Sequence, residues 1–204
     1  MKQTIWNLLL ADIKNEIGVA ALMGNLQAES GLIPYRVQGD FSDGYVNSIT
    51  YTEKVNTGEI SEYDFVNNGP GGGGYGLAQW TYYSRKQALY NMYKTGYPSI
   101  GDVNLACDYL LYELKNSYPT VYSALILASS IRYASNIVLH EFEKPADQSE
   151  EVEVLRAQLG TAIYEEMTGT SPITPTDKKK KRKFNFILFN RRRNYGQRFI
   201  PRKN

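Results

Sequence analysis

Apolar residues recur at helical spacing along most of the first 167 residues, and this periodicity limits the possible folds more than any other feature. Ile5, Leu8 and Leu9 begin one amphipathic stretch. A second stretch carries apolar residues at positions i, i+3, i+4 and i+7, namely Val19, Leu22, Met23 and Leu26. This spacing places side chains on one face of an α-helix. The sequence therefore predicts a mainly α fold.

Helical patterning is interrupted once and then resumes. The interval between residues 35 and 80 is rich in Gly, Asn, Ser, Thr and Tyr, which predicts a small loop-rich or β lobe inserted early in a helical domain. Helices are expected again over about 81–94, 102–114, 130–142 and 147–167, with a further one that starts near Thr120. Thr81, Asp102 and the Asp147/Glu150 pair are expected to cap three of them.

Charge divides the chain into an acidic body and a basic tail. Residues 1–176 hold 11 Lys and Arg against 20 Asp and Glu, a net charge of −9, while residues 177–204 carry +11. We expect a domain over 1–167, a Pro-containing linker over 168–177 and a tail over 178–204 that is disordered or docks onto a partner. A basic tail of this kind attracts anionic wall polymers, lipid headgroups, nucleic acid or an acidic protein surface, and the sequence does not select among them. Specific nucleic-acid binding is not expected, because the acidic body repels a polyanion.

Composition also narrows the possible chemistry. Zinc-dependent amidases and endopeptidases need several His ligands, and the sequence contains only His140, so no metal or cofactor is expected. Cys107, the single cysteine, lies on an apolar stripe with Leu110, Leu111 and Leu114, which favours a core thiol over a nucleophile. The first residues lack the pattern of a secretory signal, and no segment is expected to span a membrane.

The stretch GNLQAESGL, residues 24–32, places the carboxyl group of Glu29 on a mostly apolar helix. Glu29 follows Leu26 by three residues and Leu22 by seven, so it projects from the core-facing side and is expected at the inner edge of a cleft. Partial burial disfavours the charged form of a carboxyl group, which suits a proton donor working near neutral pH.

A second unusual stretch is GGGGYGLAQWT, residues 71–81. Consecutive glycines let a backbone approach a ligand closely, and Tyr75, Gln79 and Trp80 supply two rings and an amide at short range. Such groups bind sugars. The stretch lacks the G-K-[ST] of a phosphate-binding P-loop, so phosphate binding is disfavoured.

These two stretches, followed by EFEKPADQ at 141–148, resemble the phage tail-tip lysozyme family of the lysozyme-like superfamily over about residues 4–167. The resemblance implies that Glu29 of the Glu29–Ser30 pair is the catalytic acid. It further implies a saccharide cleft lined by the second motif; the site residues it predicts are Ser30, Tyr75, Gly76, Leu77, Gln79 and Trp80. The block from Glu143 to Ala146 is interpreted as structural.

The resemblance also implies the reaction and the setting. The expected activity is hydrolysis of the β-1,4 bond between N-acetylmuramic acid and N-acetylglucosamine in peptidoglycan, without a cofactor. The expected location is a phage tail, with tail proteins as partners of residues 178–204, or the host cell wall after release.

Glycosidases usually need a second carboxylate, and the sequence leaves its identity open. Several acids of the irregular lobe are candidates, namely Asp40, Asp43, Glu53, Glu59, Glu62 and Asp64. Asp43, in a turn-like FSDG soon after the Glu29 helix, is the one selected. Two alternatives remain: a lytic transglycosylase, which gives anhydromuramyl products, and a non-catalytic tail component that binds glycan.

Overall fold

The computed structural model describes residues 1–40, 47–68 and 73–172 of the 204-residue chain. The chain divides into two compact units, 1–171 and 172–204, and the account below concerns the first. Asp43 and the basic tail lie outside the described residues.

Helices make up most of the described part, which confirms the mainly α prediction. The elements are α1 (Lys2–Ile13), α2 (Glu16–Ser30), α3 (Ser48–Thr57), the π-helical η1 (Asp64–Asn68), α4 (Tyr83–Tyr93), α5 (Val103–Ser117), α6 (Pro119–Ile126), α7 (Ile131–Ile137), the π-helical η3 (Val138–Glu143) and α8 (Glu150–Thr168). Within the described residues, β-structure is limited to two isolated antiparallel bridges, Val37 with Tyr75 and Tyr75 with Trp80. No helix in this part of the chain combines the length and apolar character needed to cross a membrane.

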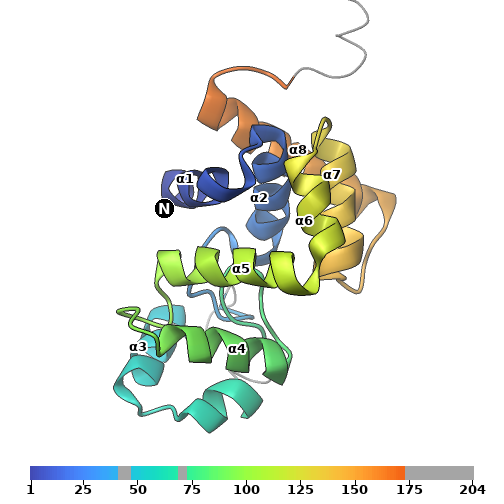
Figure 1. The fold of residues 1–204 in the computed structure, drawn as a ribbon. Helices are drawn as coiled ribbons and strands as arrows, with labels where there is room; N and C mark the ends of the chain where they lie inside the picture. Colours follow the sequence, from blue (N-terminus) through green and yellow to red (C-terminus); the bar gives the residue numbers. More distant parts are fainter. Residues whose placement is uncertain (41–46, 69–72, 173–204) are drawn as a thin grey trace, which may run out of the picture. The chain divides into compact units, whose positions relative to one another are not determined.

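Helix α2 runs through the middle of the helices α1, α6, α7 and α8, while α3 and α4 lie on the other side of α5 (Figure 1). Its residues from Gly18 to Leu26 are all buried. A helix that is buried around its circumference needs apolar or small residues on every side, which is what this segment supplies. Asn15 caps the helix by accepting hydrogen bonds from the amides of Ile17 and Gly18.

Two glycines allow α2 and α8 to pack with their backbones in close approach. A Cβ atom at Gly24 would lie 2.5 Å from the carbonyl oxygen of Arg156, and one at Gly160 would lie 2.8 Å from that of Ala20. Only residues without a side chain fit at these two points. The close packing brings Arg156 beside Asn25 and Glu29.

The cap predictions have mixed outcomes. Asp102 caps α5 as predicted, accepting from the amides of Asn104 and Leu105. Thr81 does not cap α4, which begins at Tyr83, because the Thr81 hydroxyl donates instead to the Gln79 carbonyl oxygen.

The predicted cap of α8 is also displaced. Asp147 accepts from the amide of Ser149 in a turn, and the helix begins at Glu150 with Ser149 as its N-terminal flanking residue. Cys107 is fully buried, as predicted for a core thiol, and burial raises the pKa of its thiol to about 12.

Candidate functional site

A cleft of about 450 Å³ opens beside the C-terminal end of α2. It is lined by the end of α2, the segment that follows α2, the segment that leads into α4, the first turn of α4, and the end of η3. The described lining residues are Glu29, Gln38, Gly39, Ala78, Gln79, Thr81, Tyr82, Arg85, Glu143 and Lys144.

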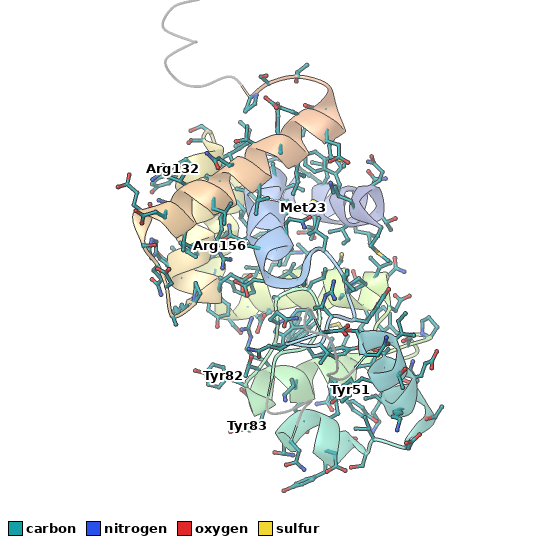
Figure 2. All side chains as sticks on the ribbon, turned by 180° about the vertical axis from the view of Figure 1, so that it is seen from behind. Met23, Tyr51, Tyr82, Tyr83, Arg132 and Arg156 are labelled. Atoms are coloured by element: carbon teal, nitrogen blue, oxygen red, sulfur yellow. The ribbon has the colours of Figure 1, made fainter. Side chains whose placement is uncertain are left out.

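Glu29 lies at the edge of this cleft, where the spacing on α2 predicted it. Its side chain is 20% exposed, and its Oε1 accepts a hydrogen bond of 2.5 Å from Nη2 of Arg156, whose side chain is 8% exposed. Arg156 lies between α8 and α2 (Figure 2). Its Nη1 also lies within 3.4 Å of the Oδ1 of Asn25. A largely buried charge-assisted bond of this kind fixes the Glu29 carboxylate in position.

Glu143 brings a second carboxyl group to the same cleft, from the last residue of η3. Its Oε1 atom is buried and has no hydrogen-bond partner among the described residues. Burial raises the pKa of Glu143 well above its usual range, and the negative charge of Glu29 raises it further. The positive charges of Arg85 and Arg156 act in the opposite direction but are smaller effects. Burial of Glu143 therefore favours its neutral form.

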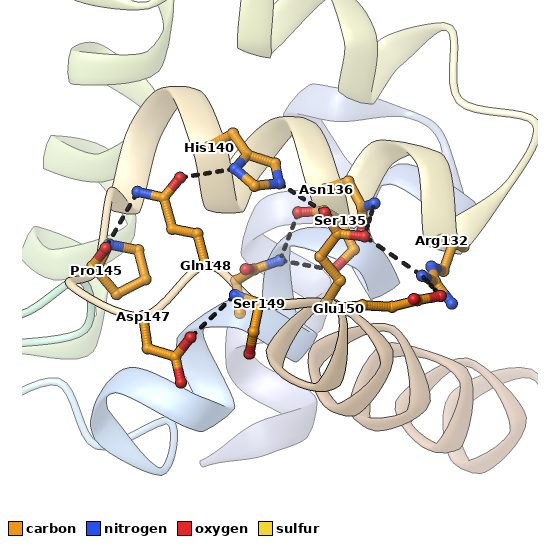
Figure 3. A network of polar contacts seen from close by, with 11 residues as sticks. Arg132, Ser135, Asn136, His140, Pro145, Asp147, Gln148, Ser149 and Glu150 are labelled. Atoms are coloured by element: carbon orange, nitrogen blue, oxygen red, sulfur yellow. Dashed lines mark hydrogen bonds and ion pairs between the residues drawn. The ribbon is translucent and has the colours of Figure 1, made fainter.

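A polar network fixes η3, and hence Glu143, against the start of α8 (Figure 3). The ring nitrogens of His140 lie 2.7 Å from Gln148 Oε1 and 2.7 Å from Glu153 Oε1. Lys144, directly after Glu143, has a φ of 49° and ends η3 in the left-handed region. The network and the turn together set the direction in which the chain leaves the cleft.

The aromatic residues of the second motif are in the core, which corrects their predicted place in the cleft. Tyr75 and Trp80 are both 0% exposed. The Trp80 Nε1 donates to Glu113 at 2.9 Å, and the Tyr75 hydroxyl lies 2.7 Å from that of Thr52. Because both rings are fully buried, neither has a face free for a sugar. Removing two large rings from water also stabilises the fold.

Three other predicted site residues have different outcomes. Ser30 is buried and its hydroxyl donates to the Leu26 carbonyl oxygen, so it does not line the cleft. Gly76 is also buried; a Cβ there would lie 2.6 Å from the Trp80 ring, so its role is close packing. Gln79 does line the cleft, and its Nε2 donates to the carbonyl oxygens of Arg36 and Gly76.

Eight of the described lining residues were not predicted as site residues, namely Gln38, Gly39, Ala78, Thr81, Tyr82, Arg85, Glu143 and Lys144. Tyr82 is 73% exposed, and like its neighbour Tyr83 it extends outward from the start of α4 (Figure 2). Its position two residues after Trp80 was the available signal. Glu143 and Lys144 belong to a block that was interpreted as structural, and their place in the cleft corrects that interpretation.

Most acids considered as a second carboxylate are engaged elsewhere. Asp40 accepts from the amide and hydroxyl of Ser48, Glu59 pairs with Lys54, and Glu62 pairs with Lys94. Asp64 accepts from Ser61. Among the described residues that line the cleft, the acidic ones are Glu29 and Glu143.

The sequence profile of phage tail lysozymes matches residues 1–167, which cover the described helices from α1 to nearly the end of α8. The chain belongs to the phage tail lysozyme family. The resemblance found in the sequence motifs is thereby confirmed, and membership associates the protein with a phage tail and with a lysozyme-like role. Comparisons with curated proteins and with solved structures gave no match.

In this phage tail lysozyme, Glu29 of the cleft is ion-paired with Arg156, whereas Glu143 has a buried carboxyl oxygen and a raised pKa. Pairs of carboxyl groups in contrasting environments are typical of glycosidases.

Proposed function

We propose that the protein is a peptidoglycan glycoside hydrolase that cleaves the β-1,4 bond between N-acetylmuramic acid and N-acetylglucosamine, and that Glu29 is an essential carboxyl group. The observation that carries the proposal is the position of Glu29. In a member of the phage tail lysozyme family, it lies at the edge of a polar cleft and is held by the largely buried Arg156.

The other groups of the cleft support a glycan as the substrate. Tyr82 offers an exposed ring on which a sugar can stack, in the role that the sequence gave to Trp80. Gln79 contributes an amide group, suited to hydroxyl and N-acetyl groups. Lys144 adds a positive charge that suits the carboxylates of the peptide stems.

The setting follows from the same proposal. We expect the protein in the tail of the virion, where it acts on the host wall during penetration, or at the wall after release. Residues 178–204 would contact tail proteins or anionic wall polymers, and no specific nucleic acid is expected.

The first test replaces Glu29 with Gln, which keeps its size and removes its charge. Loss of a catalytic proton donor or carboxylate typically lowers the rate by about 10²–10⁴-fold. We expect this loss in the release of reducing sugar ends from purified sacculi. Glu151→Gln is the control, since Glu151 is exposed at the start of α8. Wild-type activity in Glu29→Gln would contradict the proposal, provided that circular dichroism and thermal unfolding show a native fold.

The products decide between the related activities. Mass spectrometry of muropeptides is expected to show reducing N-acetylmuramic acid ends. Anhydromuramyl ends alone would instead identify a lytic transglycosylase, and binding to sacculi without soluble products would identify a glycan-binding tail component.

A further inference from the structure

Two glutamines line the cleft, and the hydrogen bonds that each makes to the backbone fix the direction of its amide group. The Oε1 of Gln38 accepts from the amide of Gly74 at 2.7 Å. The Nε2 of Gln79 donates to the carbonyl oxygens of Arg36 and Gly76, at 3.2 and 2.9 Å. Because a backbone N–H only donates and a backbone carbonyl only accepts, neither side-chain amide can turn over without losing these bonds.

The fixed orientation leaves one polar atom of each glutamine side chain for a ligand. The Nε2 of Gln38 and the Oε1 of Gln79 have no hydrogen-bond partner in the part of the chain that the structure describes. Gln38 is exposed and Gln79 is half-buried, so a ligand in the cleft can reach both. The cleft therefore presents a donor from one glutamine and an acceptor from the other.

The backbone around these two glutamines holds them next to one another. The amide of Gln38 donates to the carbonyl oxygen of Gly74 at 2.9 Å. A Cβ atom at Gly74 would lie 2.6 Å from the carbonyl oxygen of Gln79, so the close approach needs a glycine at this position. Gln79 itself has a φ of 46°, in the left-handed region that residues with a side chain seldom adopt outside functional sites. The direction of both side-chain amides is therefore set before a ligand binds.

A donor beside an acceptor matches the acetamido group of an N-acetylated sugar, whose carbonyl oxygen accepts and whose N–H donates. Both sugars of peptidoglycan carry this group. A deacetylated amino sugar carries an ammonium group instead, which only donates and so leaves the Nε2 of Gln38 without a partner. The two glutamines can thus distinguish an acetylated sugar from a deacetylated one.

We infer that Gln38 and Gln79 bind the acetamido group of one sugar in the cleft and determine the specificity for N-acetylated glycan. Gln38 donates through Nε2 to the acetamido carbonyl oxygen, and Gln79 accepts through Oε1 from the acetamido N–H. The inference rests on the proposed glycosidase function and deepens it, because it names the chemical group that the cleft recognises. It leaves the role proposed for Glu29 unchanged.

The experiment uses Gln38→Glu, which keeps an oxygen for the amide of Gly74 and replaces the donating NH₂ group with a second carboxylate oxygen. The kcat/KM is measured on defined peptidoglycan fragments that are fully N-acetylated, deacetylated at the glucosamine residues, or deacetylated at the muramic acid residues. The ratio between acetylated and deacetylated fragments gives the preference, and in this ratio an effect of the new charge on Glu29 cancels. Gln158→Glu is the matched control, because Gln158 is exposed on α8 and is not among the described residues that line the cleft.

We expect the wild type and Gln158→Glu to prefer the acetylated fragment by about tenfold, since two hydrogen bonds of ordinary strength are lost with the acetamido group. The preference of Gln38→Glu should fall to about twofold or less, because its carboxylate repels the acetamido oxygen and attracts the ammonium group. The deacetylated fragment on which the preference falls identifies the sugar that is bound. A preference in Gln38→Glu equal to that of the wild type on both fragments would overturn the inference.

A binding measurement separates this inference from the proposed catalysis. In isothermal titration calorimetry the wild type should bind oligomers of N-acetylglucosamine more tightly than oligomers of glucosamine, and Gln38→Glu should lose this difference. Equal binding of the two oligomers by the wild type would overturn the inference, whatever the activity. A wild type that shows the difference in binding but releases no reducing ends from sacculi would instead contradict the proposed function alone. Thermal unfolding of Gln38→Glu should match that of the wild type, since the side chain of Gln38 is exposed.

Discussion

Glu113 shows how a single buried acid orders the wall of the cleft. It is 4% exposed, accepts a hydrogen bond from Trp80 and binds the guanidinium of Arg85 through both carboxylate oxygens. The Arg85 guanidinium also lies 5.0 Å from the ring centroid of Phe142, the neighbour of Glu143. Trp80 thus acts on the site indirectly, by orienting the residues that line it.

At the residue scale we predict that the exposed ring of Tyr82 binds glycan. Tyr82→Ala should weaken the binding of soluble peptidoglycan fragments by about 1 kcal/mol, on the order of fivefold in Kd, because ring stacking on the sugar is lost. The measurement is isothermal titration calorimetry. Tyr83→Ala is the matched control, since Tyr83 is 68% exposed and does not line the cleft. Equal weakening in both variants would contradict the assignment.

At the scale of elements, the site depends on two helix contacts. The approach of α2 to α8 sets the Glu29–Arg156 pair, and the network around His140 holds η3 against the start of α8. Both contacts end on α8, so this helix determines the position of each cleft carboxyl group.

Gly24→Ala tests the first contact. The added methyl group would lie 2.5 Å from the Arg156 carbonyl oxygen, so α8 must shift. Overpacking of this kind typically costs about 1–3 kcal/mol of stability, partly offset by the better helix propensity of Ala. We expect a lower midpoint in denaturant unfolding and lower activity per folded molecule.

Gly18→Ala is the control for that variant. Its methyl group would lie 2.1 Å from the carbonyl oxygen of Leu125, away from the cleft, so stability should fall while activity per folded molecule stays unchanged. Equal losses of activity in the two variants would argue against a specific effect on Arg156.

His140→Gln tests the second contact through its pH dependence. Hydrogen bonds to Glu153 and Gln148 raise the pKa of His140 above 6.5, and pairing with His140 lowers the pKa of Glu153, which also contacts Arg132. The raised pKa of His140 contributes stability that is fully present below about pH 6.5, the pKa of an unperturbed His. This stability is lost as the pH rises through the higher pKa that His140 has in the folded protein. Thermal unfolding should show wild type more stable than His140→Gln at pH 5.5, with the difference reduced at pH 8.5. A difference that grows with pH would contradict this linkage.

At the scale of the whole molecule, charge is divided between an acidic body and a basic tail, although the overall net charge is only +2. Residues 1–172 carry the −9 of the body, because the segment from 173 to 176 has no charged side chain. Lys and Arg clusters attract polyanions, and salt screens that attraction.

We predict that a chain ending at Pro172 loses the binding of the full chain to teichoic acid. The binding of the full chain should weaken steeply with added salt in a sedimentation assay. Cleavage of short soluble glycan fragments should be equal in the two proteins, because the cleft residues all lie before Pro172. Unchanged binding in the shortened chain would contradict the prediction that the tail binds teichoic acid.

The sequence by itself determined the helical character of the chain, the cap at Asp102, the buried thiol of Cys107 and the position of Glu29 on α2. These depend on the spacing of residues along one helix, which short-range sterics and hydrogen bonding set. It also carried the family resemblance, which the profile match confirmed.

The tertiary structure alone decided which groups meet in the cleft. Arg156 reaches Glu29 across 127 residues, Glu143 arrives at the end of η3, and Trp80 turns into the core toward Glu113. No local sequence pattern predicts these contacts, because burial and ion pairing depend on how helices that are distant in the sequence pack together. The raised pKa of Glu143 follows from that packing, since burial of a carboxyl group disfavours its charged form.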